Sequence, residues 1–150
     1  MRAPSIMSRP RIFRRQADRA QILAMAARLT EDERQRLMGE FYDELVSKHP
    51  QLASHFSTLN LAQQVRKLSA TLQTLVAFAD DPRTLGVEVI RLGIKHSQRG
   101  IGSSEYRLFA TTLASVLARS QTIVRYERAR RIWLVELKAI TVTMALVDNA

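Results

Sequence analysis

Long stretches of this sequence repeat apolar residues at the spacing of an α-helix, and few residues interrupt them. Leu85, Val89, Leu92 and His96 follow one another at steps of four, three and four, which places them on one helix face. The 150 residues include only five glycines and four prolines, and so few breakers favour long helices over many short strands. We therefore expect an all-α fold, in a chain long enough for one domain with a sizeable core.

Apolar periodicity and helix-end signals predict where the helices lie. Thr30 to Glu33 has the pattern of a capping box, which starts a helix. His49-Pro50 ends that helix, because the residue before proline disfavours the helical conformation, and Asp80-Asp81-Pro82 breaks a later pattern. The expected helices are 15–29, 31–48, 59–78, one from Pro82 that Gly100 and Gly102 close, one capped by Ser103 or Ser104, and 122–147, with a short turn or helical piece at 50–56.

Positive charge is in excess. The chain has 23 Lys plus Arg against 14 Asp plus Glu, a formal net charge of +9. Much of the excess lies in two groups, which are Arg2, Arg9, Arg11, Arg14, Arg15 and Arg19, and Arg125, Arg128, Arg130 and Arg131. Such groups can meet nucleic acid, acidic lipid or an acidic protein. Solvated helix faces and a loose arm explain them more simply, and few aromatic residues accompany them for base stacking. We expect neither a nucleic-acid nor a membrane partner.

The sequence offers no candidate residues for several kinds of functional site. Without cysteine the chain has no disulfide, thiolate metal site or thiol nucleophile, which suits the cytoplasm. No apolar run approaches the roughly 20 residues of a membrane span, and the first residues lack a signal peptide's apolar block. The motifs GxGxxG, GxSxG and HExxH are also absent. We expect a soluble cytoplasmic protein without a phosphate loop, serine triad or zinc-protease site.

His96 is the one histidine that the helical pattern turns inward. A histidine on an apolar helix face is more often a hydrogen-bonded core residue than a metal ligand. A zinc site would need about three or four ligands, and the other two histidines, His49 and His55, lie where surface positions are expected. A haem needs only one protein ligand and an apolar slot between helices. These residues alone leave the core and haem interpretations open.

An ordered set of residues bears on that choice. It consists of Phe41-Tyr42, Leu45, His49-Pro50-Gln51-Leu52, Phe56, Gln64, Lys67-Leu68, Leu92-Gly93, His96, Gly100-Ile101 and Tyr106. In these residues the sequence resembles the bacterial single-domain globins, and most of all the globin domain of flavohaemoglobins, from about residue 20 to 147. The resemblance implies a globin fold. We expect a globin domain over 15–150, after a basic flexible arm at 1–14.

The resemblance also implies roles for individual residues around haem b. His96 would be the proximal iron ligand, with Tyr106 nearby. Tyr42 and Gln64 would be the distal hydrogen-bond donors, although an ordinary polar core pair is the alternative. The other expected haem contacts are Phe56 stacked on the ring, Leu68 as the distal gate, Leu92, Ile101 and Lys95, and the candidates to pair with the propionates are Lys67, Arg91, Lys95 and Arg99.

These roles imply a globin that binds dioxygen reversibly and tightly, and also nitric oxide or carbon monoxide. Nitric oxide dioxygenation with an external reductase is the enzymatic alternative, and a haem-free basic helical module that binds nucleic acid or a partner is a third interpretation. The chain departs from flavohaemoglobins in two respects. The position of their proximal glutamate falls at about Ala150, which weakens the case for an activated histidine. The sequence also stops before any flavin or nicotinamide domain, so we expect no reductase of its own.

Overall fold

The computed structural model describes residues 11–56 and 60–147 of the chain. Within these ranges the chain is helical and has no strand, which confirms the all-α expectation. No helix there is long and apolar enough to cross a membrane. The elements in order are α1 (Arg11–Arg28), α2 (Glu31–Lys48), the 3₁₀ helix η2 (Pro50–His55), α3 (Leu61–Ala77), α4 (Pro82–Gln98), α5 (Ser103–Arg119) and α6 (Tyr126–Leu146).

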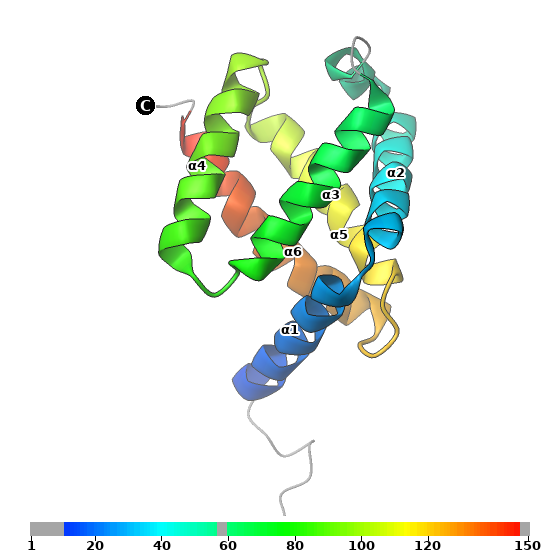
Figure 1. Cartoon of the computed structure of the whole chain (residues 1–150), viewed down its shortest axis with the longest axis vertical. Coiled ribbons are helices and arrows are strands. Elements are labelled where there is room, and N and C mark those ends of the chain that lie inside the picture. The colour runs from blue at the N-terminus through cyan, green and yellow to red at the C-terminus, as the bar shows by residue number, and fades with distance from the viewer. Residues whose placement is uncertain (1–10, 57–59, 148–150) are drawn as a thin grey trace, which may run out of the picture.

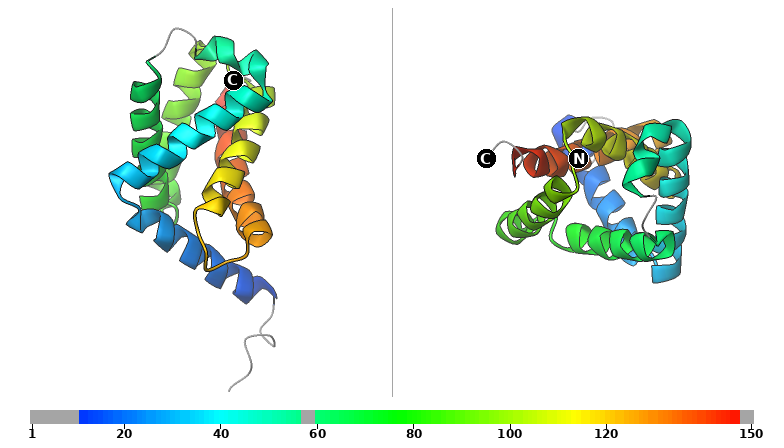
Figure 2. Two further views of the ribbon diagram at one scale, coloured as in Figure 1. Left: turned by 90° about the vertical axis from the view of Figure 1, so that its right-hand side faces the viewer. Right: turned by 90° about the horizontal axis from the view of Figure 1, so that it is seen from above.

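The helices form two layers. Figure 1 shows α3 and α4 in front, with α5 and α6 crossing behind them, and the side view in Figure 2 separates the two pairs. α5 packs along α6, α2 packs on both α3 and α5, and α4 packs on α6. α3 and α4 scarcely touch each other. The two front helices are thus held by different partners, and the space between them, which holds a cavity of about 60 Å³, is called the slot below.

The main core lies between α1, α2, α5 and α6. Phe41, Met38, Val116 and Ala114 have no exposed surface, and the rings of Phe41 and Phe109 meet edge to face with 4.7 Å between centroids. A buried aliphatic or aromatic side chain contributes about 1.5–3 kcal/mol through burial. This core therefore stabilises the packing of these helices, and α3 adds Leu72 to it.

The capping box predicted at Thr30 is present. The Thr30 hydroxyl accepts a hydrogen bond from the Glu33 N–H at 3.1 Å, and the Glu33 carboxylate accepts one from the Thr30 N–H at 3.3 Å. Asn60 and Asp81 cap α3 and α4 in the same way, through Gln63 and Thr84. The predicted break before Pro82 is therefore a helix start.

The ends of three helices differ from prediction. α1 begins at Arg11 and so takes in residues 11–14, which we had assigned to the arm; no glycine or proline follows Pro10 to prevent this. Residues 1–10, the rest of the predicted arm, lie outside the described ranges. The N-cap of α5 is Gly102, not Ser103 or Ser104, because the Glu105 carboxylate accepts the Gly102 N–H at 3.1 Å.

α6 begins at Tyr126, four residues after the predicted start at 122. The Gln121 side chain accounts for the delay. Its amide donates to the Val124 carbonyl at 2.7 Å, and its oxygen accepts the Val124 N–H at 3.2 Å. Because these bonds already satisfy the backbone at Val124, the chain forms a loop there before the helix starts, with Gln121 and Val124 buried.

Ion pairs attach α1 to the rest of the molecule. Arg19 pairs with Glu136 of α6 and with Asp80, and Arg128 of α6 pairs with Asp18. Two arginines from the basic groups seen in the sequence are therefore occupied by acids of the same chain. Their charge serves helix packing, which agrees with the simpler interpretation of those groups.

Candidate functional site

α4 carries His96 at the edge of the slot. The His96 Nδ1 lies 2.7 Å from the Leu92 carbonyl oxygen. A carbonyl can only accept a hydrogen bond, so Nδ1 carries the proton and Nε2 keeps a free lone pair in the neutral ring. Burial lowers the pKa of His96, and the positive charges of Arg99 and Lys95 lower it further, although the Leu92 bond opposes them. The ring is therefore neutral at physiological pH, and its Nε2 can donate an electron pair.

A glycine turn fixes the end of α4 directly after His96. The Ile101 N–H donates to the His96 carbonyl at 3.1 Å and the Gly100 N–H donates to the Ser97 carbonyl at 3.0 Å. This is the Schellman pattern, which needs a left-handed residue after the helix. Gly100 supplies it with a φ of 76°. The turn returns the half-buried Ile101 to the apolar cluster around Val89.

A second glycine sets how closely α4 approaches α6. A Cβ on Gly93 would lie 3.0 Å from both the Met144 carbonyl oxygen and a Val147 methyl carbon. Since only a glycine avoids this clash, the backbones can approach closely at that point. The contact holds the helix that carries His96 against the back layer. It thereby sets the position of the slot wall.

Tyr42 and Gln64 lie on the other side, on α2 and α3. Both are buried, and the Tyr42 ring packs on the Phe56 ring edge to face at 5.3 Å. Burial raises the pKa of Tyr42 to about 12, although the Arg99 charge opposes the rise. Its hydroxyl therefore stays protonated and can donate.

One charged residue lies near both sides. Arg99 lowers the pKa of Tyr42 and of His96, so its guanidinium lies within electrostatic reach of both groups. The ring of Tyr106, on α5, meets the His96 ring edge to face at 6.0 Å. Leu68 is half-buried against the main core, beside Phe56. The structure thus places Tyr42, Phe56 and Leu68 in one apolar cluster and Tyr106, Leu92 and Ile101 in a second, with His96 beside Tyr106 and Lys95 exposed on α4.

Two further leucines pack near the slot. Leu75 of α3 and Leu85 of α4 pack around the same small cluster as Leu92. Their spacing was a usable signal, because Leu85 lies seven residues before Leu92 and Leu75 lies seven after Leu68. A cavity of about 60 Å³ remains there, lined by Thr71, Thr74, Leu75, Glu88 and Leu92.

The donor set fits a large flat ring that brings its own metal. No group of three or more histidine or acidic side chains that could hold a bare ion occurs in 11–56 and 60–147, whereas a metal already held by a ring needs one protein ligand. His96 offers one, between half-buried aliphatic walls. The 60 Å³ cavity is smaller than such a ring, so Leu75 and Leu92 would have to move apart for one to bind. The scarcity of contacts between α3 and α4 permits this.

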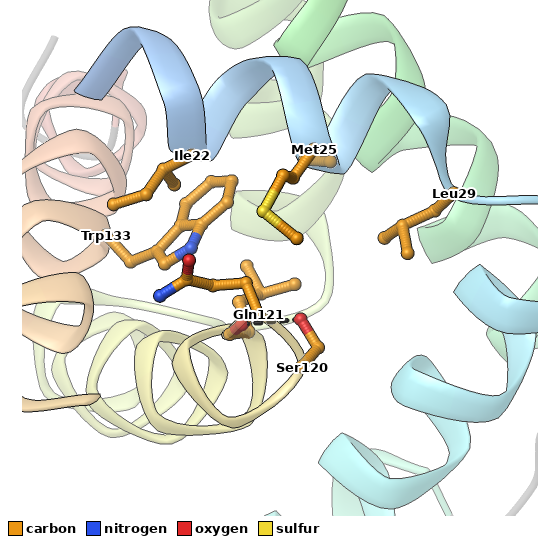
Figure 3. Close-up of a pocket in the computed structure, with 8 residues that line it drawn as sticks. Ile22, Met25, Leu29, Ser120, Gln121 and Trp133 are labelled. Carbon is orange, nitrogen blue, oxygen red and sulfur yellow. Dashed lines mark hydrogen bonds between the residues drawn. The ribbon is translucent and has the colours of Figure 1, made fainter. Parts of the chain in front are cut away.

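A separate cavity lies between α1, α5 and α6. Figure 3 shows Met25 and Leu29 over it, with Trp133 and Gln121 opposite. Its volume of about 20 Å³ has room for a water-sized molecule, and the buried Trp133 Nε1 finds no hydrogen-bond partner within the described chain. None of the predicted site residues lines it. The cavity therefore belongs to the packing of α1 and is no part of the slot.

Comparison with known families gives one match. A family model described as Globin matches residues 39–133, well over half of the chain. That range includes Tyr42, Phe56, Gln64, His96 and Tyr106. No curated protein matches the sequence. The position near Ala150, where flavohaemoglobins have a glutamate, lies outside the described residues.

Proposed function

The chain belongs to the globin family, and from that premise we propose that it holds haem b in the slot between α3 and α4 and binds dioxygen reversibly with high affinity. The observation that carries the proposal is the pair of groups bordering the slot. The His96 Nε2 has a free lone pair on one side, and the Tyr42 hydroxyl is a buried, protonated donor on the other. Carbon monoxide and nitric oxide would enter the same slot.

The residues have separate tasks in holding the haem. His96 would bind the iron through Nε2, while the Leu92 carbonyl fixes the ring orientation and tautomer. Phe56, Leu68, Leu92 and Ile101 would cover the faces of the ring and exclude water. Lys95 and its neighbours at the rim would pair with the propionates. When bound, haem supplies an iron atom that binds diatomic gases.

Tyr42 and Gln64 would set how long a ligand stays. Both can donate hydrogen bonds to a ligand that gains negative charge in the slot. If each charge-assisted bond contributes about 1.5–3 kcal/mol, the two together slow ligand loss by roughly two to four powers of ten. This is the arrangement of polar donors that the resemblance to flavohaemoglobins implies. Dioxygen gains more from it than carbon monoxide, which develops less charge.

The hydrogen-bond partner of His96 favours reversible dioxygen binding over nitric oxide dioxygenation. Its Nδ1 donates to a neutral backbone carbonyl. A carboxylate there would raise the basicity of the ring further and push electrons toward iron. If the chain is nevertheless a dioxygenase, its oxygenated form will convert nitric oxide to nitrate repeatedly when a reductase is supplied. Only one nitrate formed per haem would be a single reaction without turnover, and it would not show dioxygenase activity.

Absorption spectra test the proposal directly. The ferric, dithionite-reduced and carbon monoxide forms should show a haem with one histidine ligand, and His96→Leu should lose that coordination. Tyr42→Phe should speed dioxygen dissociation by about ten- to a hundredfold, the loss of one charge-assisted bond. Tyr126→Phe is the matched control, because Tyr126 is exposed at the start of α6. A purified chain that takes up no haem would refute the proposal.

A further inference from the structure

Charge is divided unevenly between the helices. α2 carries six acids and three cations, which are Glu31, Asp32, Glu33, Glu40, Asp43 and Glu44, and Arg34, Arg36 and Lys48. α3 has no acid, and the only acid of α4 is Glu88. The cations of the two front helices and the α4 C-cap are Arg66, Lys67, Arg83, Arg91, Lys95 and Arg99, and Asp81 is a second acid at the α4 N-cap. The net charge of +9 is therefore concentrated partly on the walls of the slot.

These cations border the opening of the slot. Arg91, Lys95 and Arg99 follow at steps of four, so they form one exposed stripe on α4. That stripe runs beside the one that carries Leu92 and His96. On α3, Lys67 is exposed and lies next to Leu68. We call Arg66, Lys67, Arg91, Lys95 and Arg99 the cationic mouth. Figure 1 shows α3 and α4, which carry it, on the side facing the reader.

The haem of the proposed function would not neutralise the mouth. Glu88 pairs with Arg91 at 3.6 Å, and two propionates would offset two more cations. A positive excess remains at the place where the ring edge reaches solvent. Such an excess attracts a partner with an acidic surface and speeds its encounter. Arg19 and Arg128, by contrast, already pair with acids of this chain.

We propose that the cationic mouth is the docking surface of an acidic electron-carrier protein, of the flavin or iron–sulfur class. This inference rests on the proposed function, because the ring edge in the mouth is where an electron would enter. One electron leaves the reduced carrier and converts ferric to ferrous iron, and no proton or other reactant is needed. Nucleic acid fits less well, since neither α3 nor α4 has a Phe, Tyr or Trp for base stacking.

The test uses the whole chain and an acidic [2Fe–2S] ferredoxin as the probe. Lys67→Glu/Arg99→Glu reverses one cation on each side of the mouth. Arg125→Glu/Arg131→Glu makes the same change in net charge at exposed positions by the start of α6. At low salt we expect the mouth variant to lower ferredoxin affinity at least about tenfold and the control to stay within about twofold. Wild-type affinity should fall steeply as salt is added.

Two further readouts keep the result clear. When ferredoxin is added, the amide chemical-shift changes of this protein should be largest on α3 and α4. They should appear with and without bound haem, so a failure to take up haem can be told from a failure to dock. The neutral variant Lys67→Gln/Arg99→Gln should give an intermediate loss with an unchanged melting temperature. Three results would overturn the proposal. They are equal losses of ferredoxin affinity in the mouth and control variants, amide shifts outside α3 and α4, and tighter binding to a 20-base-pair DNA than to ferredoxin.

Discussion

α4 and α5 are neighbours of equal length, 17 residues each, yet they bury very different shares of their side chains. α5 has eight buried residues, and α4 has only Val89 and Gly93. α4 is not short of apolar residues, because it also carries Leu85, Val87, Ile90, Leu92 and Ile94. Three of these, Val87, Ile90 and Ile94, are exposed among the described residues, so α4 contributes less to the core than α5 does.

The first test truncates one leucine on each helix. Leu113 of α5 is buried, so Leu113→Ala should lower the free energy of unfolding by about 2–5 kcal/mol. Leu92 of α4 is only half-buried, so in the haem-free protein Leu92→Ala should cost about 1 kcal/mol or less. Urea unfolding measures both. Leu92→Ala should instead speed haem loss, and equal stability losses would erase the distinction between the two helices.

The second test changes the fit of α4 on α6. Gly93→Ala places a Cβ 3.0 Å from the backbone oxygen of Met144, and such overpacking should cost about 1–3 kcal/mol. Gly86, on the same helix, has nothing within 4 Å of its Cβ position. Gly86→Ala should therefore stabilise the protein by about 0.5–1 kcal/mol. Thermal unfolding of the pair should give opposite signs, and a gain at Gly93 would contradict the close contact.

The third test compares tyrosines by phenolate absorbance. Burial raises the pKa of Tyr42 to about 12, so its absorbance change should come well above pH 10, and Tyr42→Phe should remove it. The folded state keeps this proton longer than the unfolded state does, so stability should fall as pH rises from 10 toward 12. Tyr126→Phe should remove a different part of the titration. A Tyr42 transition at pH 10 would mean that water reaches the Tyr42 hydroxyl.

The fourth and smallest effect concerns His96 in the haem-free protein. Burial lowers its pKa below the ordinary value of 6.5, so the unfolded state binds the proton more readily. Stability should therefore fall as pH drops below about 6.5, by at most about 1.4 kcal/mol per pH unit, and level off below the folded pKa. His96→Leu should flatten that slope. Denaturant unfolding at several pH values measures this dependence of stability on pH.

Much of the fold could be predicted because its signals are local. The Thr30 capping box and the break at Pro82 involve residues close in sequence, and both are present. The late start of α6 was missed because a glutamine at Gln121 can lie in a helix or fold back on a loop. Only contacts with the surrounding buried residues determine which of these two conformations forms. The haem contacts and the distal roles of Tyr42 and Gln64 stay predictions, which the spectra described above will test.

The sequence by itself determined the all-α class, most of the helix boundaries and the inward position of His96, since helical periodicity acts over a few residues. It also carried the residues matched by the globin model, 39–133. Tertiary structure alone decided that α4 rests on α6 at Gly93 and that Arg99 lies within reach of both Tyr42 and His96. The physical reason is that close packing joins residues far apart in the chain, whose separations no local pattern records.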